Sequence, residues 1–165
     1  MRQICAIIIL AIATPLYAEN TFQVMSDPMT DVRSGIAILN IGGKIKPFIK
    51  CDKSSNGSLY ITFMASRYLG VTRHKRKIVV RFDEGTPYKV SAYQYKRSAT
   101  VKKLDPKRPS GRLLMDMYNS KNMVVQLTTY DGDVITDAFA LDNATNVIYQ
   151  AINTCNDTAW SATPQ

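Results

Sequence analysis

Short extended segments separated by turn signals dominate this sequence and limit it to a β-rich fold. The clearest segment places Leu59, Ile61 and Phe63 on one face, which is the period-two pattern of a half-buried strand. The dipeptide Asp131-Gly132 stands between two apolar runs and predicts a two-residue hairpin turn. The segments predicted to be extended are 21–25, 34–41, 45–51, 58–63, 78–82, 88–95, 123–130 and 134–141.

Two short helices are predicted in the second half of the chain. The first follows Ser110, a favoured N-cap residue, because the apolar residues of segment 113–118 share one face at helical spacing. The second is predicted to start after Asp142 or Asn143. The polar, basic segment 96–111 is predicted to be a long loop. These extended segments and two short helices predict an α+β fold, mostly antiparallel and sandwich-like.

Residues 1–18 have the three-part layout of a secretory signal peptide. Arg2 makes the start basic, an apolar run follows, and Ala18 supplies the small residue before the expected cleavage site. The apolar run is shorter than the about 20 residues that a membrane-spanning helix needs, so no transmembrane anchor is expected after cleavage. Residues 19–165 are then predicted to form a single globular domain with a frayed C-terminal tail, periplasmic or secreted.

Two cysteines, Cys51 and Cys155, remain after the predicted cleavage. In an oxidising compartment such a pair in a small domain forms a structural disulfide. The bridge would close a loop of about 100 residues and pin the last helix to the strand that ends at Cys51. A metal-binding or reactive pair is the alternative, but His74 is the only histidine and a metal site needs three or four ligands. No metal and no cofactor are therefore predicted.

The positive charge of the chain is clustered. The formal net charge is +8, and basic residues concentrate in two runs, at 73–77 and 96–112. Such clusters favour anionic partners, which outside the cytoplasm are membrane headgroups, acidic glycans or an acidic protein, with no nucleic acid expected. A solvated surface that only keeps the protein soluble is the alternative. The residues predicted to form a basic binding patch are Arg73, Lys75, Arg76, Lys77, Lys102, Lys103, Lys107 and Arg108.

The sequence carries no motif of an enzyme. The patterns GxSxG, HExxH, GxGxxG and the P-loop are all absent from it. His74 lies within a basic run, whose cations disfavour its protonated form, and it is predicted to be an exposed loop residue. The carboxylates of Asp83, Glu84, Asp131 and Asp133 lie at predicted turns, where aspartate bonds to the local backbone. The chain is therefore predicted to be non-enzymatic, with no catalytic residues.

The order of several segments carries a family resemblance. These segments are SDPMTD at 26–31, PFIKC at 47–51, SLYITF at 58–63, VVRFD at 79–83, YKVSAYQYKRSA at 88–99, LLMDMYNS at 113–120, QLTTYDGD at 126–133 and DAFALDNATNVIYQAINTC at 137–155. Their order resembles that of VasI-like proteins, which are associated with bacterial type VI secretion gene clusters. That family tends to carry tryptophan where this chain has Phe22, Phe63 and Asn156. The resemblance implies an exported accessory protein and no catalytic residues.

Three functions are compatible with these observations. The leading one is an exported, disulfide-stapled, non-enzymatic binding or accessory protein of the bacterial envelope, linked to a secretion system. The second is a secreted cationic effector, exclusion or immunity factor that acts at an anionic envelope surface. An envelope hydrolase is the third and the least supported, because no catalytic motif is present. Recovery of an acidic partner protein would favour the first, and salt-sensitive binding to anionic vesicles the second.

Overall fold

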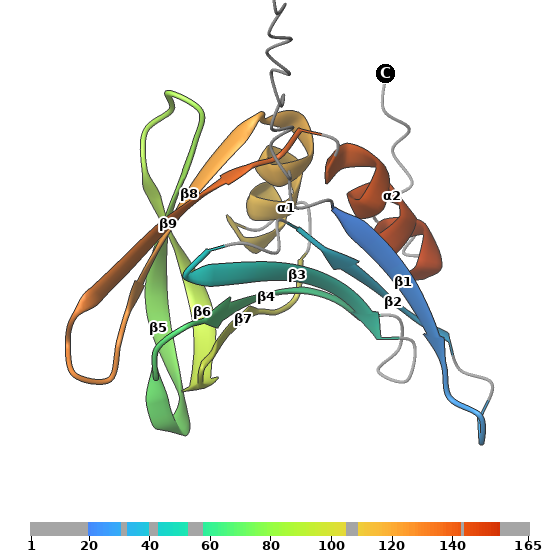
Figure 1. Cartoon of the computed structure of the whole chain (residues 1–165), viewed down its shortest axis with the longest axis horizontal. Helices are drawn as coiled ribbons and strands as arrows, with labels where there is room; N and C mark the ends of the chain where they lie inside the picture. Colours follow the sequence, from blue (N-terminus) through green and yellow to red (C-terminus); the bar gives the residue numbers. More distant parts are fainter. Residues whose placement is uncertain are drawn as a thin grey trace, which may run out of the picture.

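A single curled sheet organises the protein. The computed structural model describes residues 20–30, 33–39, 43–52, 58–104, 109–142 and 144–155. Their nine strands form one antiparallel sheet in the order β1-β2-β3-β4-β7-β6-β5-β8-β9, and both helices lie against its concave side (Figure 1). The elements are β1 (Thr21–Ser26), β2 (Arg33–Ile38), β3 (Ile45–Asp52), β4 (Ser58–Ala65), β5 (Gly70–Phe82), β6 (Tyr88–Lys96), β7 (Ser98–Val101), α1 (Pro109–Asn119), β8 (Asn122–Thr128), β9 (Val134–Ala140) and α2 (Ala144–Cys155).

The predicted α+β class and the mostly antiparallel arrangement are confirmed. Leu59, Ile61 and Phe63 of β4 are buried, as their period-two spacing predicts. The strands form one sheet and not two stacked ones, because β5 and β8 continue the ladder beyond β6 without a break. The concave face of this sheet and the apolar faces of both helices share one hydrophobic core.

Strand β5 begins at Gly70, so the prediction of a strand that starts at Ile78 is wrong. The first basic run lies inside the strand, where its backbone pairs with β6 in a register that sets Lys75 opposite Tyr93. Most side chains of segment 71–77 are exposed, so their charges remain in water. The ladder to β6 therefore outweighs the weak strand propensity of these residues.

The predicted long loop at 96–111 contains a strand, so that prediction is also wrong. Strand β7 pairs with β6 on one side and with β4 on the other, after a tight turn that holds Lys96 at a φ of 50°. Helix α1 begins at Pro109, a residue that suits the first helical position because it has no backbone N–H. Ser110 is thus inside the first turn and not at the N-cap, and its Oγ donates a hydrogen bond to the carbonyl oxygen of Lys103 (2.7 Å).

The β8–β9 hairpin is confirmed, but its turn is longer than predicted. The backbone N–H of Thr129 donates a hydrogen bond to the carbonyl oxygen of Asp133 (2.8 Å), so the loop comprises residues 130–132. Gly132 has a φ of 91°, which is a left-handed conformation that glycine adopts without strain. The Asp-Gly signal therefore locates the turn correctly but does not determine its length.

Contacts between distant strands hold the curl of the sheet. Oδ2 of Asp137 on β9 accepts a hydrogen bond from the backbone N–H of Ile45 at the start of β3 (2.8 Å). Gly43 approaches the same carboxylate so closely that a Cβ atom there would collide with Oδ2. After β4, Arg67 forms an ion pair with Asp133 in the β8–β9 turn (2.8 Å). These contacts bring β9 and its turn against the opposite half of the sheet.

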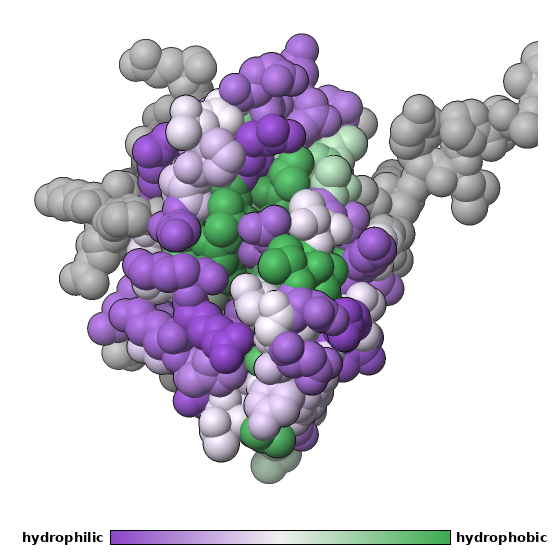
Figure 2. Space-filling model, turned by 90° about the vertical axis from the view of Figure 1, so that its left-hand side faces the viewer, coloured by the Kyte–Doolittle hydropathy of each residue, from purple (hydrophilic) through white to green (hydrophobic). Residues whose placement is uncertain are grey.

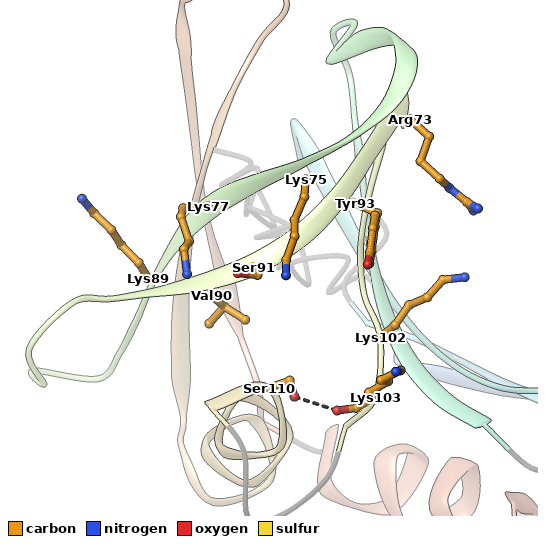
Figure 3. Close-up of a pocket in the computed structure, with 10 residues that line it drawn as sticks. All are labelled: Arg73, Lys75, Lys77, Lys89, Val90, Ser91, Tyr93, Lys102, Lys103 and Ser110. Carbon is orange, nitrogen blue, oxygen red and sulfur yellow. Dashed lines mark hydrogen bonds between the residues drawn. The ribbon is translucent and has the colours of Figure 1, made fainter.

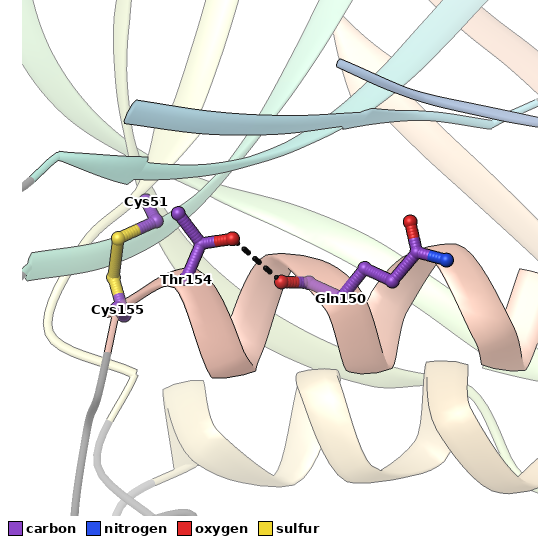
Figure 4. The surroundings of a disulfide bond; sticks show 4 residues. All are labelled: Cys51, Gln150, Thr154 and Cys155. Atoms are coloured by element: carbon purple, nitrogen blue, oxygen red, sulfur yellow. Dashed lines mark hydrogen bonds between the residues drawn. A yellow bond between two sulfur atoms is a disulfide. The ribbon is translucent and has the colours of Figure 1, made fainter. Parts of the chain in front are cut away.

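Helix α2 packs against β2 and β3 and carries one half of the disulfide. The predicted bridge between Cys51 and Cys155 is confirmed, with the two Cα atoms 5.4 Å apart (Figure 4). Cys155 is the last residue of α2. Gly35 of β2 permits the close approach of the last helical turn, because a Cβ atom there would stand 3.0 Å from Cβ of Thr154. Inside that turn, Oγ1 of Thr154 donates a hydrogen bond to the carbonyl oxygen of Gln150 (2.8 Å).

Several predicted features lie outside the described residues. They are the leader at 1–18, the C-terminal tail at 156–165, Lys107, Arg108 and the candidate cap Asn143. Within the described ranges, no helix is long and apolar enough to cross a membrane.

Candidate functional site

A hollow opens where β6 and β7 part. Strand β7 pairs with the segment Tyr93–Tyr95 of β6, whereas the first half of β6 continues as the partner of β5. Between that half of β6, the residues after β7 and the start of α1 lies a hollow of about 600 Å³, here named the basic hollow (Figure 3). Its lining residues are Arg73, Lys75, Lys77, Lys89, Val90, Ser91, Tyr93, Lys102, Lys103 and Ser110.

Strand alternation explains which side chains reach the basic hollow. In β5, Arg73, Lys75 and Lys77 share one side of the sheet, and the residues between them share the other. The register sets Tyr93 of β6 opposite Lys75 on that side. Figure 3 shows Lys75, Lys77 and Tyr93 extending from the two strands toward the same space, with the residues that follow β7 across from them.

The cations of the basic hollow have no carboxylate partner in the part of the chain that the structure describes. The ion pairs found there lie elsewhere, from Arg67 to the β8–β9 turn and from Arg112 to Asp116. Six exposed side chains of like charge therefore line one hollow, and a bound anion would offset their repulsion. The six are Arg73, Lys75, Lys77, Lys89, Lys102 and Lys103.

The structure brings five of the eight residues predicted for the basic patch to the basic hollow. These five are Arg73, Lys75, Lys77, Lys102 and Lys103. Arg76 lies on the opposite side of β5, where its Nη1 donates a hydrogen bond to the carbonyl oxygen of Thr129 (3.4 Å). The two others lie outside the described residues. Lys89 and Tyr93 also line the hollow although neither is among the eight, and it is the pairing register of β5 with β6 that places them there.

His74 lies in β5 and is half-buried, so the prediction of an exposed loop histidine is wrong. Its Nδ1 is 2.8 Å from the carbonyl oxygen of Thr72. The residue opposite is Gln94, which is fully buried, and neither its amide atoms nor Nε2 of His74 has a hydrogen-bond partner among the described residues. The same residues contain no group of three or more His, Cys, Asp or Glu side chains that could hold a metal ion.

A polar cluster beside the basic hollow fixes β6 to α1. The hydroxyl of Tyr88 donates a hydrogen bond to Oδ2 of Asp116 (2.6 Å), and Nε of Arg112 lies 3.3 Å from the same oxygen. The guanidinium of Arg112 also stands 4.5 Å from the centre of the Tyr88 ring. Burial raises the pKa of the Tyr88 hydroxyl well above its ordinary value of 10.0, and the hydrogen bond to Asp116 raises it further. The cluster thus holds the start of β6, one wall of the hollow, against the helix.

Tyr88→Phe is expected to lower the free energy of unfolding by about 1–2 kcal/mol near neutral pH, because the Asp116 carboxylate loses a donor. Folding raises the pKa of Tyr88, so this stabilisation is complete below the unfolded pKa of about 10 and is lost as the pH rises above it. Urea unfolding of both proteins between about pH 7 and pH 11 tests this. The difference between them should shrink above pH 10, and a constant difference would contradict the assignment.

The residues of the basic hollow come from three separate segments of the chain, β5, β6 and the stretch from Lys102 to Ser110. What the site can do chemically is bind: it offers ammonium and guanidinium donors, hydroxyl groups and one aromatic ring. Neither a family model, nor a curated protein, nor a solved structure matches the chain.

Proposed function

We propose that this protein is an exported, non-enzymatic binding protein of the bacterial envelope, which holds an anionic partner at the basic hollow. The observation that carries the proposal is that six cations line one hollow, with no carboxylate partner in the described ranges. Like charges gathered in this way cost stability, and an anion that binds among them offsets this cost.

The cellular location is part of the same proposal. The leader at 1–18 supports export, and a disulfide such as Cys51–Cys155 persists in oxidising compartments. The resemblance to VasI-like proteins supports a role as an accessory of a secretion system. In that role the basic hollow would recognise the anionic component that the system presents in the periplasm.

A second candidate is a secreted cationic effector, exclusion or immunity factor that acts at an anionic envelope surface. In its favour, all six cations of the hollow are exposed. The face that carries β5, β8 and β9 is largely hydrophilic around a smaller apolar area (Figure 2). Exposed cations such as the six of the hollow are attracted to anionic headgroups.

Replacing Lys75, Lys77 and Lys102 by glutamate tests the proposed function. At low salt, where exposed charges interact most strongly, we expect about a 100-fold loss of binding to immobilised heparin and to phosphatidylglycerol vesicles. Heparin serves as a generic anionic glycan and the vesicles as an anionic surface. Circular dichroism should show an unchanged fold, because all three side chains are exposed.

A control variant of equal net charge shows whether binding depends on the hollow or on the overall charge of the protein. Lys44, Arg81 and Lys121 are exposed and lie outside the basic hollow, so their replacement by glutamate should weaken binding far less. An equal loss in both variants would show that the net charge and not the hollow binds the anion. Arg76 is unsuitable for either variant, because its hydrogen bond to Thr129 is structural.

A further inference from the structure

We propose that the ligand of the basic hollow is a sugar that carries phosphate groups on two sides of its ring. This inference rests on the proposed function, since it names the class of anion that the hollow binds. The shape of the hollow, the amount of charge around it and the placement of that charge each narrow the class of ligand.

The shape favours a small ligand over a protein. The hollow of about 600 Å³ lies within the range of small-molecule pockets, about 300–1,000 Å³. The centre of a protein–protein interface is depleted in lysine and enriched in aromatic and apolar side chains. Among the described residues, five lysines line the basic hollow, and Val90 is the one aliphatic residue in that lining. A protein partner would have to desolvate these ammonium groups, whereas they can gather around a small hydrated anion.

The amount of charge favours a ligand with more than one phosphate. A phosphate monoester carries a charge of about −1.5 to −2 at pH 7, which would leave most of the six cations without a counterion. The type of cation is compatible with phosphate, because lysine binds phosphate as a compact point charge and five of the six cations are lysines.

The placement of the charge separates two anion positions. Figure 3 shows Lys75 and Lys77 on one side of the hollow and Lys102 and Lys103 on the other, with Tyr93 between the two pairs. A nucleotide carries its phosphates at one end and would engage one pair at a time. A sugar ring with a phosphate on each side would engage both pairs together.

The neutral middle of the hollow fits a sugar ring. Tyr93 is 39% exposed, so part of its side chain is accessible to a ligand. Aromatic rings pack against the C–H face of a sugar, and hydroxyl groups bond to its hydroxyls. Ser91 is the residue next to Lys77 across the strand pair and adds such a hydroxyl to the lining. The shared chemistry occurs in a free sugar bisphosphate and in a lipid headgroup built on a phosphorylated sugar.

Calorimetric titration at low salt with three soluble probes tests the inference. Glucose 1,6-bisphosphate should bind at least about tenfold more tightly than glucose 1-phosphate, because it engages both lysine pairs. It should also bind more tightly than ATP, which carries about the same charge but holds all its phosphates at one end. If affinity simply follows the charge of the probe, the placement argument fails.

Variants of Tyr93 test the ring itself. Tyr93→Ala should lower the affinity for glucose 1,6-bisphosphate about tenfold, as expected for the loss of one stacking contact, while inorganic phosphate binds as before. Tyr93→Phe should retain the affinity, because it keeps the aromatic face. Equal affinities of the wild type and Tyr93→Ala for the bisphosphate would overturn the assignment of the ring.

A vesicle measurement distinguishes a lipid headgroup from a free sugar as the source of the ligand. Together with the heparin measurement, it also separates this inference from the proposed function. Tighter binding to vesicles that carry a bisphosphorylated glucosamine disaccharide headgroup than to the free bisphosphate assigns the lipid source, and the reverse assigns the free sugar. Binding to heparin that depends on Lys75, Lys77 and Lys102, without binding of any phosphorylated sugar, overturns this inference and leaves the proposed function standing. Absence of hollow-dependent binding to every anionic probe overturns both.

Discussion

Reduction of the Cys51–Cys155 bridge is expected to lower the free energy of unfolding by about 4–5 kcal/mol. The bridge closes a loop of 104 residues, and cross-linking a loop of that length removes much of the entropy of the unfolded chain. Natural domains have total stabilities of about 5–15 kcal/mol, so this single bond accounts for a large share. Urea unfolding of the oxidised and reduced wild type measures the effect without altering a side chain.

The double variant Cys51→Ser, Cys155→Ser provides the second measurement. Its free energy of unfolding should lie within about 1–2 kcal/mol of that of the reduced protein. Any difference comes from the two serine hydroxyls, which replace buried sulfur atoms and need hydrogen-bond partners. Anion binding should persist in the fraction that stays folded, since the bridge joins α2 to β3, away from the elements that line the basic hollow. Equal midpoints for the oxidised and reduced proteins would contradict the assigned role of the bridge.

Phe63→Ala is expected to lower the free energy of unfolding by about 3–5 kcal/mol, because it opens a cavity in the core of the curled sheet. Phe63 has no exposed surface and lies in β4, opposite Pro47 of β3 and Ala99 of β7. The adjacent strands limit how far the core can collapse around the missing ring. Thermal and urea unfolding both measure the change.

Met64→Ala is the matched control for this substitution. Met64 follows Phe63 in the same strand but points to the other side of the sheet, where 39% of its surface is exposed. Its truncation should therefore change stability by no more than about 0.5–1 kcal/mol. Similar losses for the two variants would contradict the alternation of buried and exposed positions in β4.

The alternation of buried and exposed residues in β4 could be predicted from the sequence because it depends only on residues that are close together along the chain. One short segment predicts a buried face formed by Leu59, Ile61 and Phe63, and all three are buried in the structure. The disulfide could be predicted for a different reason, because two cysteines that remain in an oxidising compartment usually form a bridge. Both predictions rest on chemistry that operates whatever the order of the strands.

The start of β5 could not be predicted from the sequence because the first half of the strand has no apolar face. Segment 71–77 carries exposed side chains on both sides and so lacks the period that marks a strand. Its strand character comes from hydrogen bonds to β6, whose paired residues lie 14 to 20 positions further along the chain for His74 to Lys77. The same pairing decides that Lys75 and Lys77 face the basic hollow and that Arg76 does not.

The sequence by itself therefore determined the fold class, the buried face of β4 and the disulfide, together with the basic character of two segments. The tertiary structure alone decided that these segments meet. Strand β7 pairs with β6 only as far as Thr100, and the space that opens beside the first half of β6 has Lys75 and Lys77 on one side of Tyr93 and Lys102 and Lys103 on the other. Strand order is a property of contacts between distant residues, whereas periodicity and composition report only on neighbours along the chain.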